Sequence, residues 1–357
     1  MQHFCLGTYT EPILFGTGEV FQGKGKGIYI CSFDAGKIGI KTMLPLRNPS
    51  FLCLDEERGK IYTVNEMKEY ERQFGGGISE VSYGGNGELR LERSFCTGGA
   101  DPCHIALAPD KKCVAVANFA SGSVSAFPLL PDGSLTGERQ LFSHTGSSVH
   151  PVRQRGPHAH SVIFTGGGGL LVPDLGTDQV VAYCYEGGEV RPDPQRTLAV
   201  KSGNGPRYGE FSPDRKHFYL INEIGSSVTH FLVDKDVLTE RETVSTLPGA
   251  FEGGNICSDL HITPDGKNLF ASNRGHDSLA VFAIGAEGAL SALEHVPCGG
   301  RTPRSFVVDH TGCYVLVGNQ DSDLITTFEI QGGGHLQMIS QTNCPSPVCL
   351  KFFTSSL

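Results

Sequence analysis

Residues 260–273 read Leu260-His261-Ile262-Thr263-Pro264-Asp265-Gly266-Lys267-Asn268-Leu269-Phe270-Ala271-Ser272-Asn273, and they give the clearest indication of how the chain folds. Its Pro-Asp-Gly segment favours a tight turn, and the runs on either side carry the β-branched and aromatic residues typical of strands. A loop at 275–277 separates this pair from a third apolar run at 278–284, and a fourth strand is expected to start at 286–291. The stretch therefore predicts one four-stranded antiparallel unit.

The same pattern recurs about every 44 to 55 residues along the chain. Its seven copies begin at Asn48-Pro49-Ser50, Asp101-Pro102-Cys103, Gly156-Pro157-His158, Gly205-Pro206-Arg207, Cys257-Ser258-Asp259, Thr302-Pro303-Arg304 and Ser346-Pro347-Val348. One such unit cannot bury both of its faces until neighbouring units stack against it. The repeat therefore predicts an all-β, seven-bladed β-propeller that occupies residues 1–357 as one domain.

The two ends of the chain complement each other. The last copy, residues 346–353, supplies only a first strand, and residues 4–8, 27–33 and 38–40 resemble a second, third and fourth strand. We therefore expect both termini to share one blade, which closes the ring without a free sheet edge.

Composition narrows the class of protein. The formal net charge is -9 and no run of Lys or Arg occurs, so a nucleic-acid partner is not expected. There is no long apolar run and no recognisable secretion signal, which predicts a cytoplasmic protein without a membrane partner. The 12 Cys residues are scattered without Cys-x-x-Cys spacing, and six lie within apolar strand patterns: Cys31, Cys53, Cys113, Cys184, Cys313 and Cys349. We expect reduced, buried thiols.

The repeat also locates a site. In an antiparallel unit, the start of the first strand and the end of the second lie side by side on one rim. The first-strand positions on this rim are Ser50, Cys103, His160, Arg207, Ser258, Arg304 and Val348. The second-strand positions are Glu66, Phe119, Asp174, Glu223, Arg274, Gln320 and Thr8. The rim thus carries one His, three Arg and three carboxylates.

Three Arg side chains around one channel repel one another unless carboxylates or an anionic ligand compensate them. Arg binds carboxylate or phosphate through its two-pronged guanidinium group, so a small anionic ligand is the natural partner. The alternative is a solvated rim on which these residues form structural ion pairs.

Several short phrases of the sequence resemble those of a known family. The matching phrases are Gly7-Thr8-Tyr9-Thr10, Asn48-Pro49-Ser50-Phe51-Leu52, Val64-Asn65-Glu66, Pro157-His158-Ala159-His160-Ser161, Pro173-Asp174-Leu175-Gly176-Thr177-Asp178, Gly205-Pro206-Arg207, Asn222-Glu223 and Ser272-Asn273-Arg274-Gly275-His276-Asp277-Ser278. They resemble the seven-bladed propeller lactonases, which include the propeller-type bacterial 6-phosphogluconolactonase and the fungal carboxy-muconate lactonizing enzyme. The resemblance spans nearly the whole chain in order.

The resemblance implies an active site at His160, Arg207, Glu223 and Arg274, the same four residues that the rim count selects. The residues expected to contact the substrate are His158, Arg304, Asp174, Glu66, Arg153 and Gln320. Either His158 or His160 could be the functional histidine, since both can lie on one face of a strand.

The implied reaction is hydrolysis of a sugar-acid lactone such as 6-phosphogluconolactone, a step of the pentose phosphate pathway. His160 would act as general base, with Glu223 either orienting it or serving as the base itself. Arg207 and Arg274 would stabilise the oxyanion, and Arg304 would contact a phosphate. No cofactor is expected, and the His158-x-His160 spacing is too weak a signal to predict a metal.

Two other functions remain open. The same scaffold could form a lactone by cyclising carboxy-muconate, or it could bind proteins without catalysis. The chain has no Trp, so the Trp-Asp signature of one large class of interaction propellers is absent.

Two long loops could cover the mouth of the channel. The linker at 143–155 carries His144, His150, Arg153 and Arg155 and leads directly to the predicted site. The charged stretch at 66–73 is the second candidate. Either could instead be a solvated loop.

Overall fold

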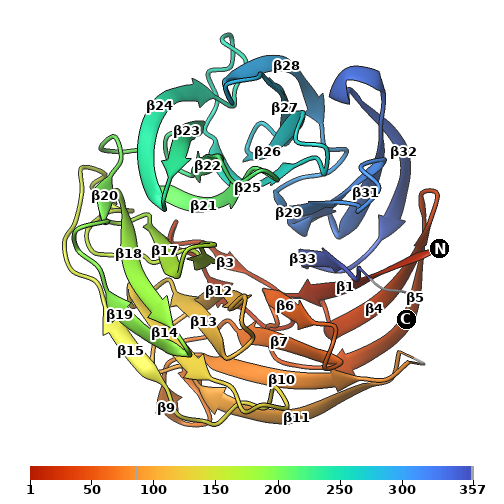
Figure 1. Cartoon of the computed structure of the whole chain (residues 1–357). Helices are drawn as coiled ribbons and strands as arrows, with labels where there is room; N and C mark the ends of the chain where they lie inside the picture. Colours follow the sequence, from red (N-terminus) through yellow and green to blue (C-terminus); the bar gives the residue numbers. More distant parts are fainter. Residues whose placement is uncertain (86, 355–357) are drawn as a thin grey trace.

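Seven antiparallel sheets are arranged in a ring in the computed structural model, which describes residues 1–85 and 87–354 (Figure 1). The predicted seven-bladed propeller is confirmed. The predicted domain of residues 1–357 also includes residues 86 and 355–357, which lie outside the described residues.

The first three blades contain the following strands in spatial order. The first blade contains β33 (Pro347–Phe352), β1 (Gln2–Thr8), β4 (Gly27–Asp34) and β5 (Lys37–Pro45). The second contains β6 (Leu52–Asp55), β7 (Lys60–Asn65), β10 (Gly77–Tyr83) and β11 (Leu89–Cys96). The third contains β12 (Pro102–Leu107), β13 (Cys113–Asn118), β14 (Ser123–Pro128) and β15 (Gln140–Ser143).

The remaining four blades continue the pattern. Blade four contains β16 (Ile163–Phe164), β17 (Gly169–Asp174), β18 (Gln179–Glu186) and β19 (Glu189–Pro192), and β20 (Leu198–Ala199) also pairs with β18. Blade five contains β21 (Pro206–Phe211), β22 (His217–Asn222), β23 (Ser227–Asp234) and β24 (Val237–Ser245), and blade six contains β25 (Ile256–Ile262), β26 (Asn268–Arg274), β27 (Ser278–Ile284) and β28 (Leu290–Pro297). Blade seven contains β29 (Pro303–Val308), β30 (Tyr314–Asn319), β31 (Leu324–Ile330) and β32 (Leu336–Asn343).

Short elements interrupt the blades. Two small hairpins are formed by β2 (Ile13–Leu14) with β3 (Val20–Phe21) and by β8 (Glu69–Tyr70) with β9 (Gln73–Phe74). Two single-turn 3-10 helices, η1 (Gln320–Ser322) and η2 (Gly332–Gly334), precede and follow β31.

The Pro-Asp-Gly turn forms as its sequence predicts. Gly266 has a φ of +72°, which side-chain-bearing residues rarely adopt, and its N–H donates to the carbonyl of Thr263 at 2.8 Å. The Asp265 carboxylate accepts hydrogen bonds from the Thr263 hydroxyl at 2.7 Å and the Lys267 N–H at 3.1 Å. The turn therefore satisfies its own polar groups and joins β25 to β26.

The core lies between neighbouring sheets. In one cluster, Ile221 and Val228 of one blade pack against Leu260 and Leu269 of the next, and all four side chains are fully buried. Each blade thus covers the face that its neighbour would otherwise expose to water.

In three blades an Asn at or near the end of the second strand binds the connection from the preceding blade. The Asn65 amide donates to the carbonyl of Arg47, the Asn273 amide to Thr246, and the Asn319 amide to Cys298. Each acceptor lies in the connection that enters the blade, so this Asn fixes where the connection crosses the rim.

The ring closes through both ends of the chain, as predicted. Strand β33 pairs antiparallel with β1, with Phe4 opposite Phe352 and Leu6 opposite Leu350. The rings of Phe4 and Phe352 are 5.6 Å apart in an edge contact. Figure 1 shows the last strand lying beside the first.

One composition-based expectation needs correction. All twelve cysteines are free, but Cys184 and Cys313 are exposed rather than buried. Cys184 lies on a strand face that is open to solvent, and Cys313 lies in a turn, so their apolar sequence neighbours were a poor guide to burial.

Removing β33 should destabilise the whole ring. Deletion of residues 346–357 exposes the apolar partners of Val348, Leu350 and Phe352, and we expect the melting temperature to fall by about 10 °C or more. Calorimetry on a chain ending at residue 345 measures this, and a chain ending at residue 354 is the control. A soluble truncation with an unchanged melting temperature would contradict closure by the termini.

Candidate active site

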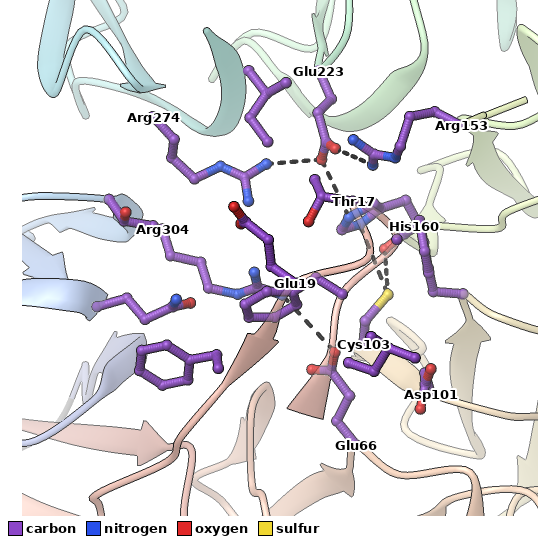
Figure 2. Close-up of a pocket in the computed structure, with 18 of the residues that line it drawn as sticks. Thr17, Glu19, Glu66, Asp101, Cys103, Arg153, His160, Glu223, Arg274 and Arg304 are labelled. Atoms are coloured by element: carbon purple, nitrogen blue, oxygen red, sulfur yellow. Dashed lines mark hydrogen bonds and ion pairs between the residues drawn. The ribbon is translucent and has the colours of Figure 1, made fainter. Parts of the chain in front are cut away.

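A cavity of about 640 Å³ opens where the starts of the first strands meet the ends of the second strands. Its polar lining residues are Thr17, Glu19, Glu66, Asp101, Cys103, Arg153, His160, Glu223, Arg274, Thr302, Arg304, Gln320 and Asp321. Figure 2 shows these side chains converging from several blades. The rim position predicted from the repeat therefore coincides with a cavity.

Glu223 is the centre of this cluster. One of its oxygens accepts a hydrogen bond from Arg153, and the other accepts from Arg207 and Arg274, both at 2.9 Å. Glu223 follows β22, Arg207 lies on β21, and Arg274 ends β26, so the ion pairs join two adjacent blades to a loop.

The charge of Glu223 is fixed by these neighbours. Its side chain is buried, and burial by itself would raise the pKa of the carboxyl group. The guanidinium groups of Arg153, Arg274 and Arg207 outweigh burial and hold this pKa well below its usual range. Glu223 is therefore ionised and a poor proton acceptor.

His160 faces Glu223 across a gap. Its Nε2 is 3.7 Å from a Glu223 oxygen, and its Nδ1 is 3.8 Å from the Cys103 sulfur. Burial and the nearby Arg207 charge hold the His160 pKa well below its ordinary value. The imidazole is therefore neutral near pH 7 and can accept a proton.

Cys103 lies beside His160, but its thiol is not a reactive nucleophile. Its thiol contacts the His160 carbonyl at 3.3 Å, and burial raises its pKa well above the usual range. Because the reactive form of cysteine is the thiolate, a protonated Cys103 is a packing and orienting neighbour.

Arg207 lies next to the large cavity but does not line it. With His160 and Asp259 it lines an adjoining cavity of about 20 Å³. Its guanidinium group also donates to the carbonyl of Ser258. Arg207 is thus held by both Glu223 and the backbone of β25.

Arg304 and Glu66 form a second, looser pair on the other side. Their closest atoms are 3.9 Å apart, and Glu66 also accepts a hydrogen bond from the Tyr9 hydroxyl at 2.8 Å. The Arg304 guanidinium lies 5.2 Å from the centre of the Tyr9 ring and 5.1 Å from that of Phe15. Burial raises the pKa of Glu66.

The two loops contribute one side chain each. From the linker at 143–155, Arg153 reaches the cavity, and from the stretch at 66–73, Glu66 does so. Gln320 lines the cavity as predicted and donates a hydrogen bond to Asp321 at 2.8 Å.

The structure does not place Asp174 or His158 at the cavity. In blade five the rim residue Glu223 follows the second strand, and its backbone N–H donates to the carbonyl of Gly205, just before the first strand. In blade four the equivalent N–H belongs to Leu175, which donates to the carbonyl of His158. Asp174 is therefore one residue short of the rim position, and a one-residue shift turns a strand side chain to the other face. The same shift makes Tyr9, rather than Thr8, the rim residue of β1.

Asp174 instead organises its loop. Its carboxylate accepts hydrogen bonds from the N–H groups of His158, Gly176 and Thr177, and it pairs with His144 at 2.6 Å. The His158 ring stacks on Phe119, with ring centres 4.5 Å apart. Both residues position the segment that carries His160, and His160 is the histidine at the cavity.

Sequence reasoning missed the hairpin of β2 and β3, which forms one wall of the cavity through Phe15, Thr17 and Glu19. A length signal existed: residues 9–26 separate β1 from β4, whereas residues 223–226 separate the equivalent β22 and β23. It also missed Asp101, which lines the cavity and whose pKa is raised by burial to about 7.

Among the described residues, no group of three or more His, Cys, Asp or Glu side chains could hold a metal ion.

Within residues 1–85 and 87–354, no helix is long and apolar enough to cross a membrane.

The assignment of Asp174 to structure predicts a stability effect. Asp174→Ala leaves three backbone N–H groups and His144 without their acceptor, so we expect the free energy of unfolding to fall by about 2 to 4 kcal/mol. Urea denaturation measures the loss, with Glu287→Ala, at an exposed turn, as the control. A variant as stable as the wild type would refute this role.

Comparison with known proteins identifies the family of this chain. Residues 3–352 match the family model described as "Lactonase, 7-bladed beta-propeller". The chain is 30% identical to the 6-phosphogluconolactonase of Bacillus subtilis (strain 168), over 94% of this chain and 97% of that protein. It is 32% identical to a 6-phosphogluconolactonase of Formosa agariphila, over 85% of this chain and 88% of that protein.

Solved structures give the same result. A putative 6-phosphogluconolactonase from Bacteroides fragilis superposes with a TM-score of 0.89 at 31% identity, covering 99% of this chain and 98% of its own. The periplasmic gluconolactonase of Pseudomonas aeruginosa superposes with a TM-score of 0.90 at 30% identity, covering 98% of each chain. This chain therefore belongs to the seven-bladed β-propeller lactonase family.

Proposed function

We propose that this protein hydrolyses a sugar-acid lactone at the cavity described above, with 6-phosphogluconolactone as its substrate. The observation that carries the proposal is a neutral, buried histidine at the edge of a cavity, next to a carboxylate that holds three guanidinium groups in place. That arrangement provides a base and fixed positive charge together. The names of the relatives support a lactone as the substrate class.

His160 is the proposed base. It takes a proton from a water molecule as the water oxygen attacks the lactone carbonyl carbon. It then gives this proton to the ring oxygen when the ring C–O bond breaks. The product is an open-chain hydroxy acid, which ionises at neutral pH.

Glu223 orients the arginines and does not take a proton from the attacking water. Three guanidinium groups hold the pKa of its carboxyl group well below the usual range and occupy both of its oxygens. Its role is to orient Arg153 and Arg274, which line the cavity, toward the oxygen that becomes negative in the tetrahedral intermediate. One such preorganised donor typically contributes roughly 2.7 to 4 kcal/mol to transition-state stabilisation.

Arg304 is the proposed contact for the phosphate. Its charge is only loosely compensated, since the nearest Glu66 oxygen is 3.9 Å away and burial raises the pKa of that carboxyl group. A phosphate oxygen offers Arg304 a closer partner than Glu66 does. With this substrate the enzyme would act in the pentose phosphate pathway, and its free cysteines suit the reducing cytoplasm.

The site predicts a specific pattern of lost activity. His160→Ala and Arg207→Ala should each lower kcat/KM for 6-phosphogluconolactone by about 100-fold or more, because one loses the base and the other loosens Glu223. Initial rates are corrected for spontaneous lactone opening, and Arg191→Ala, a surface arginine paired with Glu189, is the control. Undiminished catalysis in both site variants would eliminate this site, and cyclisation of carboxy-muconate by the wild type would favour lactone formation instead.

The low pKa of His160 predicts the pH dependence. A base must be unprotonated in the free enzyme, and His160 stays unprotonated down to well below pH 6.5. We therefore expect kcat/KM to be flat through pH 6.5 and to fall only at lower pH. A fall centred near pH 7 would point to Asp101 rather than His160.

A further inference from the structure

The hairpin of β2 and β3 places a carboxylate in the cavity that the mechanism does not use. Thr17 and Glu19 lie near its tip and line the cavity. Figure 2 shows both side chains directed into the space bounded by Arg274, Arg304 and His160.

The hairpin is held in a defined position. The Phe15 N–H donates to the Glu19 carbonyl at 2.9 Å, and the Gly18 N–H, at a φ of +90°, donates to the Phe15 carbonyl at 2.9 Å. The rings of Phe15 and Phe21 each lie 5.9 Å from that of Tyr9, which is completely buried. Aromatic packing therefore anchors the hairpin, and with it the backbone that carries Glu19, to the rim.

Glu19 differs from the other carboxylates that line the cavity. Each of the others has a partner: Glu223 pairs with three arginines, Glu66 with Tyr9 and Arg304, Asp101 with Lys68, and Asp321 with Thr302 and Gln320. Among the described residues, Glu19 has no side-chain hydrogen bond and no ion pair within 4 Å. Its two oxygens are free to accept hydrogen bonds from a ligand.

The chemistry of a free carboxylate restricts that ligand. Two carboxylate oxygens can accept hydrogen bonds from two hydroxyl groups on neighbouring carbons, and hydrogen bonds to a charged acceptor are stronger than neutral ones. A second anionic group at this position would be repelled instead. Resting on the proposed lactonase function, we propose that Glu19 determines specificity by binding a pair of adjacent hydroxyl groups on the sugar lactone.

Two lactones with the same ring test the role of Glu19. Glucono-δ-lactone carries ring hydroxyls, whereas δ-valerolactone has none. Loss of charge-assisted hydrogen bonds in Glu19→Ala should lower kcat/KM for glucono-δ-lactone by about 10-fold to 100-fold, mainly through a higher KM, while δ-valerolactone changes by less than about threefold. Glu19→Gln keeps one acceptor oxygen and should lose less. Glu11→Gln, which alters a carboxylate of the same segment outside the cavity, should match the wild type.

The possible outcomes separate this inference from the function it rests on. A wild type that hydrolyses neither lactone nor 6-phosphogluconolactone would refute the proposed function. Equal losses on both lactones, or no loss on either, would overturn the role of Glu19 alone. Calorimetric titration with gluconate, which keeps the hydroxyls, decides the question without catalysis: binding by the wild type that weakens at least 10-fold in Glu19→Ala supports hydroxyl recognition, and absent or unchanged binding contradicts it.

Discussion

The buried carboxylate of Glu223 compensates the buried guanidinium groups of Arg153 and Arg207 and the partly buried one of Arg274, and the candidate active site depends on this interaction. Without Glu223, Arg153, Arg207 and Arg274 would repel one another in a region with little water to screen them. Because Glu223 accepts hydrogen bonds from all three guanidinium groups, it reduces their mutual repulsion and allows them to lie close together. Burial and the charges of Arg207 and Arg304 lower the proton affinity of His160, which lies beside this cluster.

The propeller makes this cluster possible. Each blade brings one residue from its first strand and one that follows its second strand to the same rim, and the ring brings seven such pairs around a common axis. The candidate active-site residues are side chains at equivalent positions in a few blades, supported by Asn residues that bind the connections between blades.

Two departures from the repeat add side chains to the cavity. The linker before blade four supplies Arg153, and the insertion between β1 and β4 supplies the hairpin with Glu19. Both segments cross the open end of the ring, where they can alter the shape and charge of the cavity without disturbing a sheet.

The number of blades, the closure by the termini and the rim positions of His160, Arg207, Glu223, Arg274 and Arg304 could be predicted from the sequence, because strand periodicity and Pro-Asp-Gly turns are local and repeat. Which rim residues face the cavity became clear only from the folded chain. Asp174 and His158 turned out to support a loop, because a one-residue shift in blade four is invisible until the hydrogen bonds across the rim are known. The wall formed by Phe15, Thr17 and Glu19 also required the structure, because an insertion has no repeat to place it and its position depends on packing against Tyr9.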